Sequence, residues 1–377
     1  MASLPRVGFI GWNPFQVLHA LPLAKTIPGA CFIIEKRKEY INDFTDSILV
    51  DHGVPFMVWD RAKMPLLDGV FDIIVCQTPF FRIETFEKTK IAMMQYGYAK
   101  EPHNYGAWRS FADLCLAYGP YAADKLQNFS PTIAVGNPRY DDWALESFHV
   151  KAVAKHRDQK DPSKKTVLYL PTWGDLSSVD QYLATVYELS EKYNVLLKLH
   201  HNTELLESGR KEKIVASRIS HFGANDDLLE LISVADVVIS DYSGAIFDAI
   251  FCKKPVILLN SPEDMQLGSK KLDSESLEYS RRSELGLIVE HNAQLADAVD
   301  CAMEDPEACM INNAKLYTEL FTPTVDAKGL AYQAILDLHA GKFGRTQAQR
   351  YIRTEIRELF TTKRLLAIAS KKTKGKK

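Results

Sequence analysis

The sequence has few features of a secreted, disulfide-bonded or membrane-spanning protein. Its six cysteines are scattered, with no Cys-x-x-Cys pair and no cluster of histidines beside them. Most lie in apolar runs, where a thiol behaves as a small hydrophobic side chain, and this usage is typical of a reduced compartment. No apolar run approaches the roughly 20 residues that span a bilayer, and the first residues lack a basic stretch followed by an apolar one. We therefore expect a cytoplasmic protein.

Net charge is also small, but it is unevenly distributed. The 377 residues carry a net charge of −2, which taken alone argues against a nucleic-acid-binding protein. The segment 342–377 nevertheless carries +10, so the rest of the chain carries −12. The apolar fraction of 46% and the charged fraction of 25% are those of a folded globular protein. The length suits two domains of ordinary size.

Short apolar runs alternate with longer amphipathic segments, and this alternation predicts β-α units with mainly parallel sheets. We predict strands at 7–11, 31–35, 56–59, 72–76, 92–95, 114–118 and 132–135, and then at 166–170, 195–199, 218–222, 237–240, 255–259 and 287–289. We predict helices near 15–24, 180–192, 227–234, 245–251, 293–303, 323–338 and 346–368. The first strand and turn lack Gly-x-Gly-x-x-Gly, so the sequence gives little support for a nicotinamide cofactor.

The composition turns polar and basic between about 145 and 165, which predicts a helix followed by a linker. We accordingly predict an N-terminal α/β domain at 1–145, a linker at 146–165, a second α/β domain at 166–340, and a basic C-terminal helix and tail at 341–377. Two such domains in tandem place a cleft between the carboxyl ends of two sheets, where ligands of these folds bind.

The strongest local pattern is a buried strand that ends in Ser240-Asp241-Tyr242-Ser243-Gly244 and leads into a helix. Ser243 is well placed to cap this helix. The small residues let a phosphate approach the free N–H groups and the positive end of the helix dipole. Alternatively, Ser243 only caps its helix. Asp241 suggests a further contact, such as a polyol or sugar hydroxyl.

Three other turns are predicted at the same cleft. His200 and His201 follow a strand, and either can donate to a phosphate or leaving group, or simply cap the strand end. The loop Pro171-Thr172 offers a hydroxyl and backbone amides. Arg139 follows a Gly-Asn-Pro turn, where its fork of donors suits a phosphate; a salt bridge to Asp141 or Asp142 is the alternative.

Together and in this order, these motifs resemble those of the CDP-glycerol glycerophosphotransferase family, whose members build teichoic acids and related capsule polymers. The resemblance covers mainly residues 92–260. The matching segments are Gly136-Asn137-Pro138-Arg139-Tyr140-Asp141, Tyr169-Leu170-Pro171-Thr172-Trp173, Lys198-Leu199-His200 and the block from Asp236 to Asp248, and Asp227 resembles an upstream family aspartate.

The resemblance implies a GT-B fold of two Rossmann-like domains that face each other across a cleft. It implies that a CDP-polyol donor is held chiefly by the second domain, with no metal and no other cofactor. The donor-binding residues would be Pro171, Thr172, Asp227, Ser243 and Gly244, together with Arg139 at the end of the first domain. The first domain would hold a saccharide or lipid-linked acceptor. The implied reaction is attack by an acceptor hydroxyl on the polyol phosphate, glycerol phosphate or ribitol phosphate, with release of CMP.

One segment departs from the family pattern. The family usually carries Trp-His-Gly in the first domain, and its histidine is the favoured base for the acceptor hydroxyl. The equivalent stretch here is Met94-Gln95-Tyr96-Gly97-Tyr98. We predict Gln95, Tyr96 and Tyr98 on the acceptor side. His103, a few residues later, can substitute as the base, or a tyrosine can hold the acceptor while a carboxylate acts as base.

We therefore predict His200, His103 and Asp241 as catalytic residues. Two other hypotheses stay open: a GT-B glycosyltransferase or UDP-GlcNAc 2-epimerase-like enzyme that uses a nucleotide sugar, favoured by the missing Trp-His-Gly, and a degenerate member that binds nucleotide without catalysis.

The C-terminal helix is basic and amphipathic. Its basic residues are Arg345, Arg350, Arg353, Arg357, Lys363 and Arg364, and apolar residues recur between them at helical spacing. One face can pack while the basic face points outward, which suits the anionic inner surface of a membrane. The alternative is a helix that bridges domains and exposes a solvated face. Nucleic acid is not predicted as a partner, since no stacking aromatic residues are interleaved with the charge.

Overall fold

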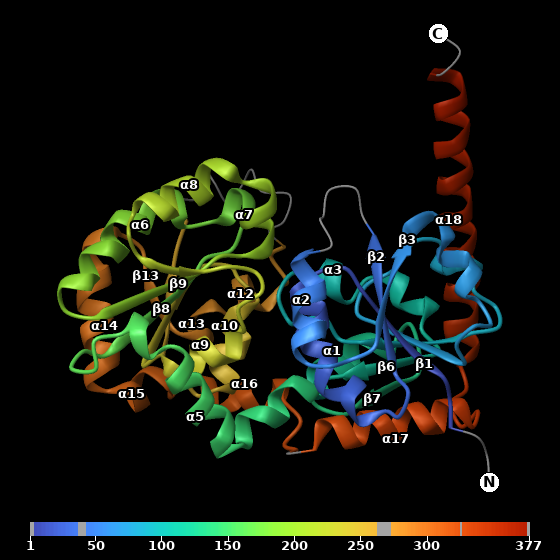
Figure 1. Cartoon of the computed structure of the whole chain (residues 1–377), viewed down its shortest axis with the longest axis horizontal. Helices are drawn as coiled ribbons and strands as arrows, with labels where there is room; N and C mark the ends of the chain where they lie inside the picture. The colour runs from blue at the N-terminus through green and yellow to red at the C-terminus, as the bar shows by residue number, and fades with distance from the viewer. Residues whose placement is uncertain (1–3, 37–42, 262–272, 325, 375–377) are drawn as a thin grey trace.

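The computed structural model describes residues 4–36, 43–261, 273–324 and 326–374, and its described residues form two parallel sheets, one in each half of the chain (Figure 1). The strands of the first sheet are β1 (Val7–Gly11), β2 (Cys31–Lys36), β3 (Phe56–Asp60), β4 (Ile73–Cys76), β5 (Lys90–Met94), β6 (Leu114–Ala117) and β7 (Thr132–Ala134). Those of the second are β8 (Thr166–Leu170), β9 (Asn194–Lys198), β10 (Ser220–Phe222), β11 (Val237–Ser240), β12 (Val256–Leu259) and β13 (Leu287–Val289). The predicted strands are confirmed, with ends that differ by at most two residues.

Both sheets are doubly wound. Their strand orders are β3-β2-β1-β4-β5-β6-β7 and β10-β9-β8-β11-β12-β13, and the paired strands are parallel, as between β1 and β4 and between β8 and β11. In each sheet the order reverses beside the first strand of that domain. Ligands of such sheets bind outside the carboxyl ends of the strands, at this reversal.

Helices connect the strands. Those before residue 165 are α1 (Pro14–Thr26), α2 (Asp43–Asp51), α3 (Glu101–Asn104), α4 (Pro120–Leu126) and α5 (Glu146–Lys155). Those up to residue 290 are α6 (Val179–Glu188), α7 (His201–Leu206), α8 (Ser208–Ala216), α9 (Leu228–Val234), α10 (Ala245–Phe251), α12 (Leu277–Ser280) and α13 (Arg282–Leu285). The last are α14 (Leu295–Glu304), α15 (Pro306–Met310), α16 (Asn313–Leu320), α17 (Ala327–His339) and α18 (Gln347–Lys374).

Helix α17 belongs to the core of the first sheet, although the sequence assigns its residues to the second domain at 166–340. Its buried Ala331, Ile335 and Leu338 pack in the same cluster as Val7 and Phe32, and Figure 1 shows α17 below the first domain. Helical spacing of apolar residues predicts a buried face, but it does not say which sheet that face covers.

The start of α17 also differs from the predicted helix at 323–338. Asp326 caps the helix by accepting the N–H of Gly329. The Asp141 carboxylate, which belongs to the first domain, accepts the N–H groups of Ala327 and Lys328, both at 2.8 Å. Side chains that are far away in the sequence therefore fix where this helix begins.

The two domains share a continuous apolar interface. The Tyr140 and Phe251 rings stack with centroids 3.8 Å apart, and the Tyr98 and Phe247 rings lie 5.4 Å apart. The Tyr140 hydroxyl donates to Asp248 at 2.9 Å. These contacts join the segment after β5 and η4 (Pro138–Ala144), which follows β7, to α10 of the second domain.

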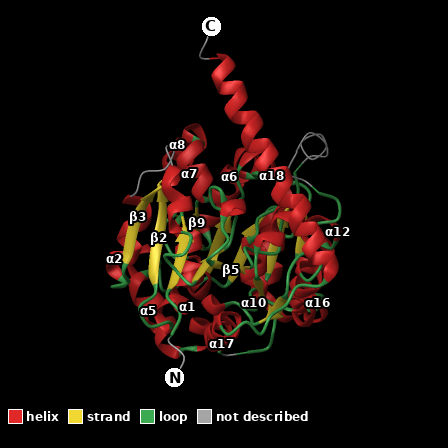
Figure 2. Ribbon diagram, turned by 90° about the vertical axis from the view of Figure 1, so that its right-hand side faces the viewer, coloured by secondary structure: helices red, strands yellow, loops and turns green. Residues whose placement is uncertain are grey.

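Helix α18 crosses the first domain and then extends beyond it (Figures 1 and 2). Ile356 and Phe360 pack against the core, and the Phe111 and Phe360 rings lie 5.0 Å apart. Arg353 pairs with Asp113, and Arg364 pairs with Glu84.

The prediction that the basic face points outward therefore needs correction. Besides Arg353 and Arg364, Arg345 pairs with Asp113 and Arg357 donates to the carbonyl of Phe86. The amphipathic pattern could not show that acidic groups of the first domain lie under this part of the basic face.

Candidate active site

A pocket lies between the carboxyl ends of the two sheets and is lined by both domains. The first-domain wall comes from α1, the segment after β5 and the turn after β7. The second-domain wall comes from the segments after β8, β9, β10 and β11. Of the sequence-predicted site residues, the pocket is lined by Tyr96, Tyr98, His103, Arg139, Pro171, His200, Asp227, Ser243 and Gly244. Gln95, Thr172 and Asp241 lie behind its surface.

Ser243 and Gly244 lie on the pocket wall at the start of α10. The Ser243 hydroxyl accepts the N–H of Ala245 at 3.3 Å, and Gly244 is the residue in the N-cap position, one residue later than predicted. A Cβ atom on Gly244 would lie 3.8 Å from the side chain of Ala99 in the first domain. The small residues therefore lie where the two domains approach each other.

Asp241 is fully buried and its carboxylate is already saturated. It accepts the N–H of Thr172 at 2.8 Å, the N–H and hydroxyl of Ser178 at 2.9 Å, and the N–H of Tyr242 at 2.7 Å. Burial raises the pKa of this carboxyl, and these hydrogen bonds oppose the rise. Asp241 thus positions the turns after β8 and β11, and its geometry does not offer the predicted contact with a ligand hydroxyl.

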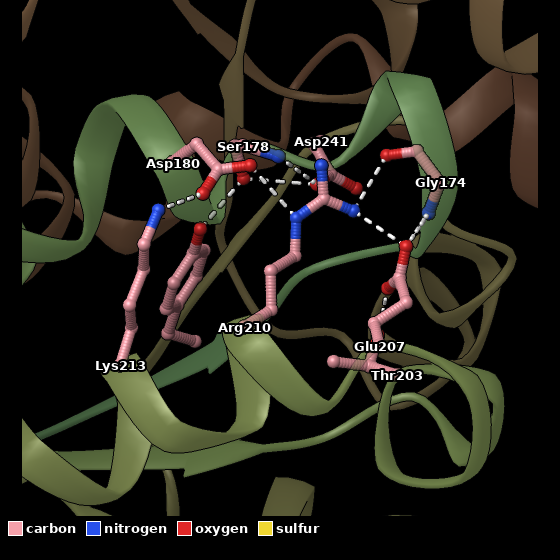
Figure 3. Close-up of polar contacts among 9 residues, drawn as sticks. Gly174, Ser178, Asp180, Thr203, Glu207, Arg210, Lys213 and Asp241 are labelled. Carbon is pink, nitrogen blue, oxygen red and sulfur yellow. Dashed lines mark hydrogen bonds and ion pairs between the residues drawn. The ribbon is translucent and has the colours of Figure 1, made fainter.

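A polar network extends this support to the next loop (Figure 3). The Glu207 carboxylate accepts the N–H of Gly174 at 2.9 Å and the hydroxyl of Thr203 at 3.0 Å. Arg210 donates to the carbonyl of Gly174 at 2.8 Å, to Glu207 at 2.7 Å and to Asp180 at 2.8 Å. The network therefore ties the loop after β8 to α7 and α8.

This network supports the two aromatic groups nearest His200. The His200 ring lies 5.9 Å from the Trp173 ring and 4.3 Å from the His201 ring, stacked on both. His200 caps α7, because its Nδ1 accepts the N–H of Asn202 at 3.1 Å. A neutral His200 therefore carries its proton on Nε2, where it can donate a hydrogen bond. Burial lowers the pKa of His201 to about 4.

Arg139 lies on the pocket wall, but carboxylates already hold its guanidinium. It pairs with Asp142 at 2.6 Å and with Asp227, which is the N-cap of α9. The predicted salt bridge to Asp142 is therefore present, and Asp227 adds a second across the domain boundary. In the same motif Gly136 has a φ of +84°, and a Cβ there would lie 2.7 Å from the Thr324 side chain, so only glycine fits.

On the first-domain wall, Gln95 and Tyr98 are structural. Gln95 is fully buried; its side chain accepts the N–H of Tyr118 at 2.7 Å and donates to the carbonyl of Gly97 at 3.1 Å. The Tyr98 hydroxyl donates to the carbonyl of Leu320. Tyr96 lines the pocket and is partly buried, and burial raises its pKa to about 12.

His103 lies at the pocket with its ring 6.2 Å from that of Tyr96. Desolvation, together with the charges of Arg109 and Lys100, lowers the pKa of His103. The imidazole is therefore neutral near neutral pH and competent to accept a proton. The predicted substitution for the family histidine has suitable geometry, and it stays a prediction.

The segment that carries His103 is held by the second domain. The N–H of Lys100 donates to Glu278 at 2.8 Å, and the N–H of Glu101 donates to the Ser276 hydroxyl at 3.0 Å. Lys100 has a left-handed backbone with a φ of 59°. Burial raises the pKa of Glu278 to about 7.

The sequence reasoning gave no role to three titratable groups of the pocket. His19, on α1, is buried with its Nδ1 unpartnered within the described chain, and burial lowers its pKa to about 3. Burial raises the pKa of Asp248 to about 7. Lys198 ends β9. Lys198 and Asp248 lie in segments that match the family motifs, which was a usable signal, whereas His19 lies within a helix whose pattern does not indicate a site.

The two doubly wound domains and the cleft between them define a GT-B fold, and solved structures share it. The structure of the wall teichoic acid polymerase TagF aligns with a TM-score of 0.63 at 17% identity, covering 89% of this chain and 88% of that chain. A putative UDP-N-acetylglucosamine 2-epimerase from Listeria monocytogenes aligns with a TM-score of 0.62 at 13% identity, covering 92% and 99%. At these identities the likeness shows the fold.

The sequence itself defines the family. The family model described as CDP-Glycerol:Poly(glycerophosphate) glycerophosphotransferase matches residues 124–328, which is more than half of the chain. The protein therefore belongs to this family, as the resemblance of its motifs predicted. The matched segment contains the Arg139, Pro171, His200 and Ser243 positions but not Tyr96 or His103.

Two curated relatives agree with this assignment. The teichoic acid poly(glycerol phosphate) polymerase of Bacillus subtilis (strain 168) is 32% identical over 109 residues, 25% of this chain and 14% of the relative. The teichoic acid glycerol-phosphate transferase of Staphylococcus aureus (strain NCTC 8325 / PS 47) is 23% identical over 267 residues, 66% of this chain and 60% of the relative. The matches thus span less than two thirds of either relative.

Proposed function

We propose that this protein transfers a polyol phosphate, glycerol phosphate first of all, from a CDP-activated donor to a hydroxyl of a saccharide or lipid-linked acceptor, and releases CMP. The observation that carries the proposal is the convergence of family-matched residues on one interdomain pocket. Arg139, Pro171, His200, Asp227 and Ser243 come from five separate segments and line that pocket together. The family membership supports the donor class.

In the proposed reaction the acceptor oxygen attacks the phosphorus of the donor's polyol phosphate. The bond from that phosphorus to the oxygen that it shares with CMP breaks, and CMP leaves with the electron pair. The acceptor proton passes to a base. His103 suits this role because its lowered pKa keeps the imidazole neutral. His200 suits the stabilisation of the departing phosphate, since it lines the pocket in the family-matched segment Lys198-Leu199-His200.

A release assay tests the proposal. Wild-type protein is incubated with CDP-glycerol or CDP-ribitol and a saccharide acceptor, and CMP and the phosphodiester product are measured together. We expect both to form in equal amounts. We expect His200→Ala to lower the rate by about 10²–10⁴-fold, whereas His221→Ala, at an exposed position on β10, retains it.

The same experiment separates the other hypotheses. Binding of UDP-sugars in preference to CDP-glycerol, with no CMP release, would support an enzyme that uses a nucleotide sugar. Cytidine nucleotide binding without turnover of any donor would support a degenerate, binding-only member. If neither CDP-glycerol nor CDP-ribitol releases CMP, the proposed activity is wrong for those donors.

We also propose that the far part of α18 binds the inner surface of a membrane, where a lipid-linked acceptor would lie. No helix in the described part of the chain is long and apolar enough to cross a membrane. Beyond its contacts with the first domain, α18 exposes Leu365 at 58%, Leu366 at 65% and Ile368 at 42%, and the sequence adds Lys371 and Lys372. Exposed apolar groups beside basic ones suit an anionic surface.

Sedimentation with vesicles of anionic phospholipid tests this location. We expect Leu365→Ser combined with Leu366→Ser to lower vesicle binding at least tenfold, because each buried leucine contributes about 1.5–3 kcal/mol. Tyr351→Ser is the matched control, since Tyr351 is 64% exposed nearer the start of α18. Equal sedimentation of the wild type with neutral and anionic vesicles would contradict the proposal.

A further inference from the structure

Lys198 occupies the carboxyl end of β9, at the same edge of the second sheet as the other donor-side residues. Lys198 and His200, the latter at the N-cap of α7, both line the interdomain pocket. Lys198 lines the interdomain pocket and is partly buried. Its ammonium donates to the carbonyl of Gly223 at 2.7 Å. Within the described ranges of the chain, it has no ion-pair partner.

This arrangement is energetically costly for a lysine. A desolvated ammonium that faces no carboxylate at ion-pair distance loses hydration without a compensating charge. Burial accordingly lowers the pKa of Lys198 to about 8, although Asp226, Asp227 and Glu204 act in the opposite direction. A positive charge kept in a pocket at such a cost is a candidate for binding an anion.

The other cations of the pocket are engaged differently. Arg139 pairs with Asp142 and Asp227, so its charge is offset before any ligand arrives. The Lys100 ammonium donates to the Thr172 hydroxyl at 3.3 Å and belongs to the opposite wall. Among the described residues, Lys198 is therefore the lysine of the second-domain wall that has no carboxylate at ion-pair distance.

We propose that Lys198 binds a phosphate of the nucleoside diphosphate donor. The inference rests on the proposed function and adds a residue to it. A compact ammonium suits a phosphate as a point charge. The acceptor is a second possible source of phosphate, but Lys198 extends from the second sheet beside His200 and Pro171, which places it on the donor side.

The proposal predicts which ligands lose affinity. Replacement of Lys198 by methionine weakens CDP strongly, weakens CMP less and leaves cytidine unchanged, because only the phosphates meet the ammonium. The direction in which CDP affinity changes with pH follows because the protonated ammonium of Lys198 is the form that binds phosphate. CDP affinity is retained below pH 8 and falls as the pH rises through the pKa of Lys198, whereas cytidine affinity does not change in this range.

Titration calorimetry of the full chain with CDP, CMP and cytidine tests the inference. We expect Lys198→Met to weaken CDP at least tenfold, Lys198→Arg to restore part of the loss, and Lys192→Met to match the wild type. Lys192 is the control because it lies just before the same strand and pairs with Asp300 at 2.7 Å. Thermal melting of each variant checks the fold, and Lys198→Gln replaces Lys198→Met if the latter does not fold.

The outcomes separate this inference from the proposed function. Wild-type affinity for CDP in Lys198→Met and Lys198→Gln overturns the role of Lys198 alone. Unchanged CDP affinity with a raised KM for a phosphate-bearing acceptor assigns Lys198 to the acceptor and overturns the donor assignment. A wild type that binds neither CDP nor CMP overturns the proposed function and this inference together.

Discussion

The two walls of the pocket are supported in different ways. The second-domain wall is fixed from within its own domain, by the Asp241 carboxylate and by the Glu207–Arg210 network. The first-domain wall around Tyr96 and His103 is instead held across the cleft, through the hydrogen bond from Lys100 to Glu278. The second-domain wall is therefore preset by one domain, whereas the first-domain wall also depends on how the two domains meet.

Asp241→Ala is expected to have the largest effect, because it removes the centre of the second-domain wall. The N–H groups of Thr172, Ser178 and Tyr242 would lose their acceptor while buried, at a cost of about 1–3 kcal/mol each. We expect a fall of at least 3 kcal/mol in the free energy of unfolding, measured in urea, together with loss of CDP binding.

This result differs from what the sequence motif alone suggests, which is loss of transfer by an intact fold. Asp241→Asn keeps one acceptor oxygen and should lose less than half as much stability. Wild-type unfolding in Asp241→Ala, with activity lost, would show that the carboxylate acts on a ligand rather than on the loops.

His103→Ala tests the first-domain wall, where we expect a smaller loss of about 100-fold in kcat. The affinity for CDP should not change if His103 acts on the acceptor, as we propose. In the wild type the rate falls as the pH drops through the pKa of His103, which lies below its ordinary value of 6.5, because the protonated ring cannot accept a proton.

In His103→Ala the rate should no longer fall as the pH drops through this range. Tyr96→Phe is the matched control, since it keeps the ring contact at 6.2 Å and removes only the hydroxyl. A normal pH profile in His103→Ala, with a loss of activity in Tyr96→Phe, would transfer the acceptor role to the tyrosine.

The same contrast explains what could be predicted from the sequence. The second-domain wall is built from strand ends and the turns that follow them, so the predicted strands that stop at Leu170, Leu199 and Ser240 already located it. The strand-end rule works because parallel strands bring their carboxyl ends to one edge.

The role of each side chain at that edge could not be predicted in the same way. Asp241 and Arg139 stand where a ligand contact is expected, but their partners are Ser178, Asp142 and Asp227, which are set by the tertiary packing. The packing of α17 on the first sheet could not be predicted for the same reason. The apolar face of a helix indicates that the helix is buried, but not which sheet it packs against.

Arg210→Met removes a smaller part of the support of the second-domain wall than Asp241→Ala does. Arg210 and Lys213 both pair with Asp180, at 2.8 and 2.7 Å, but only Arg210 also reaches Gly174 and Glu207. We expect Arg210→Met to raise the KM for the donor about tenfold, because the loop that carries Trp173 loses its tie to α8. Lys213→Met, which removes only the outer ion pair, should match the wild type, consistent with the small value of exposed salt bridges.

If the Arg210 and Lys213 variants raise the donor KM equally, the effect arises from the ion pairs with Asp180 and not from the contacts of Arg210 with Gly174 and Glu207. Arg210→Lys adds a further check, because it keeps the charge but cannot contact Gly174, Glu207 and Asp180 at once. Its donor KM should therefore lie close to that of Arg210→Met.

Glu278→Gln tests the hydrogen bond from Lys100 to Glu278, which connects the two walls, and should have the smallest effect on stability and activity. Burial raises the pKa of Glu278 to about 7 from an ordinary value of 4.5, while the charge of Lys100 lowers it and that of Glu101 raises it. A raised folded-state pKa contributes stability that is complete below pH 4.5 and is lost as the pH rises through 7.

The glutamine keeps an acceptor for the Lys100 N–H and does not titrate. We therefore expect the variant and the wild type to unfold alike near pH 5, and the variant to be more stable by about 1–3 kcal/mol at pH 8, measured by urea unfolding at both values. If the acceptor wall depends on this joint, the wild-type KM for the acceptor should also rise between pH 6 and 8 while that of Glu278→Gln stays level. If the KM for the acceptor changes with pH in the same way in both proteins, ionisation of Glu278 does not affect the first-domain wall.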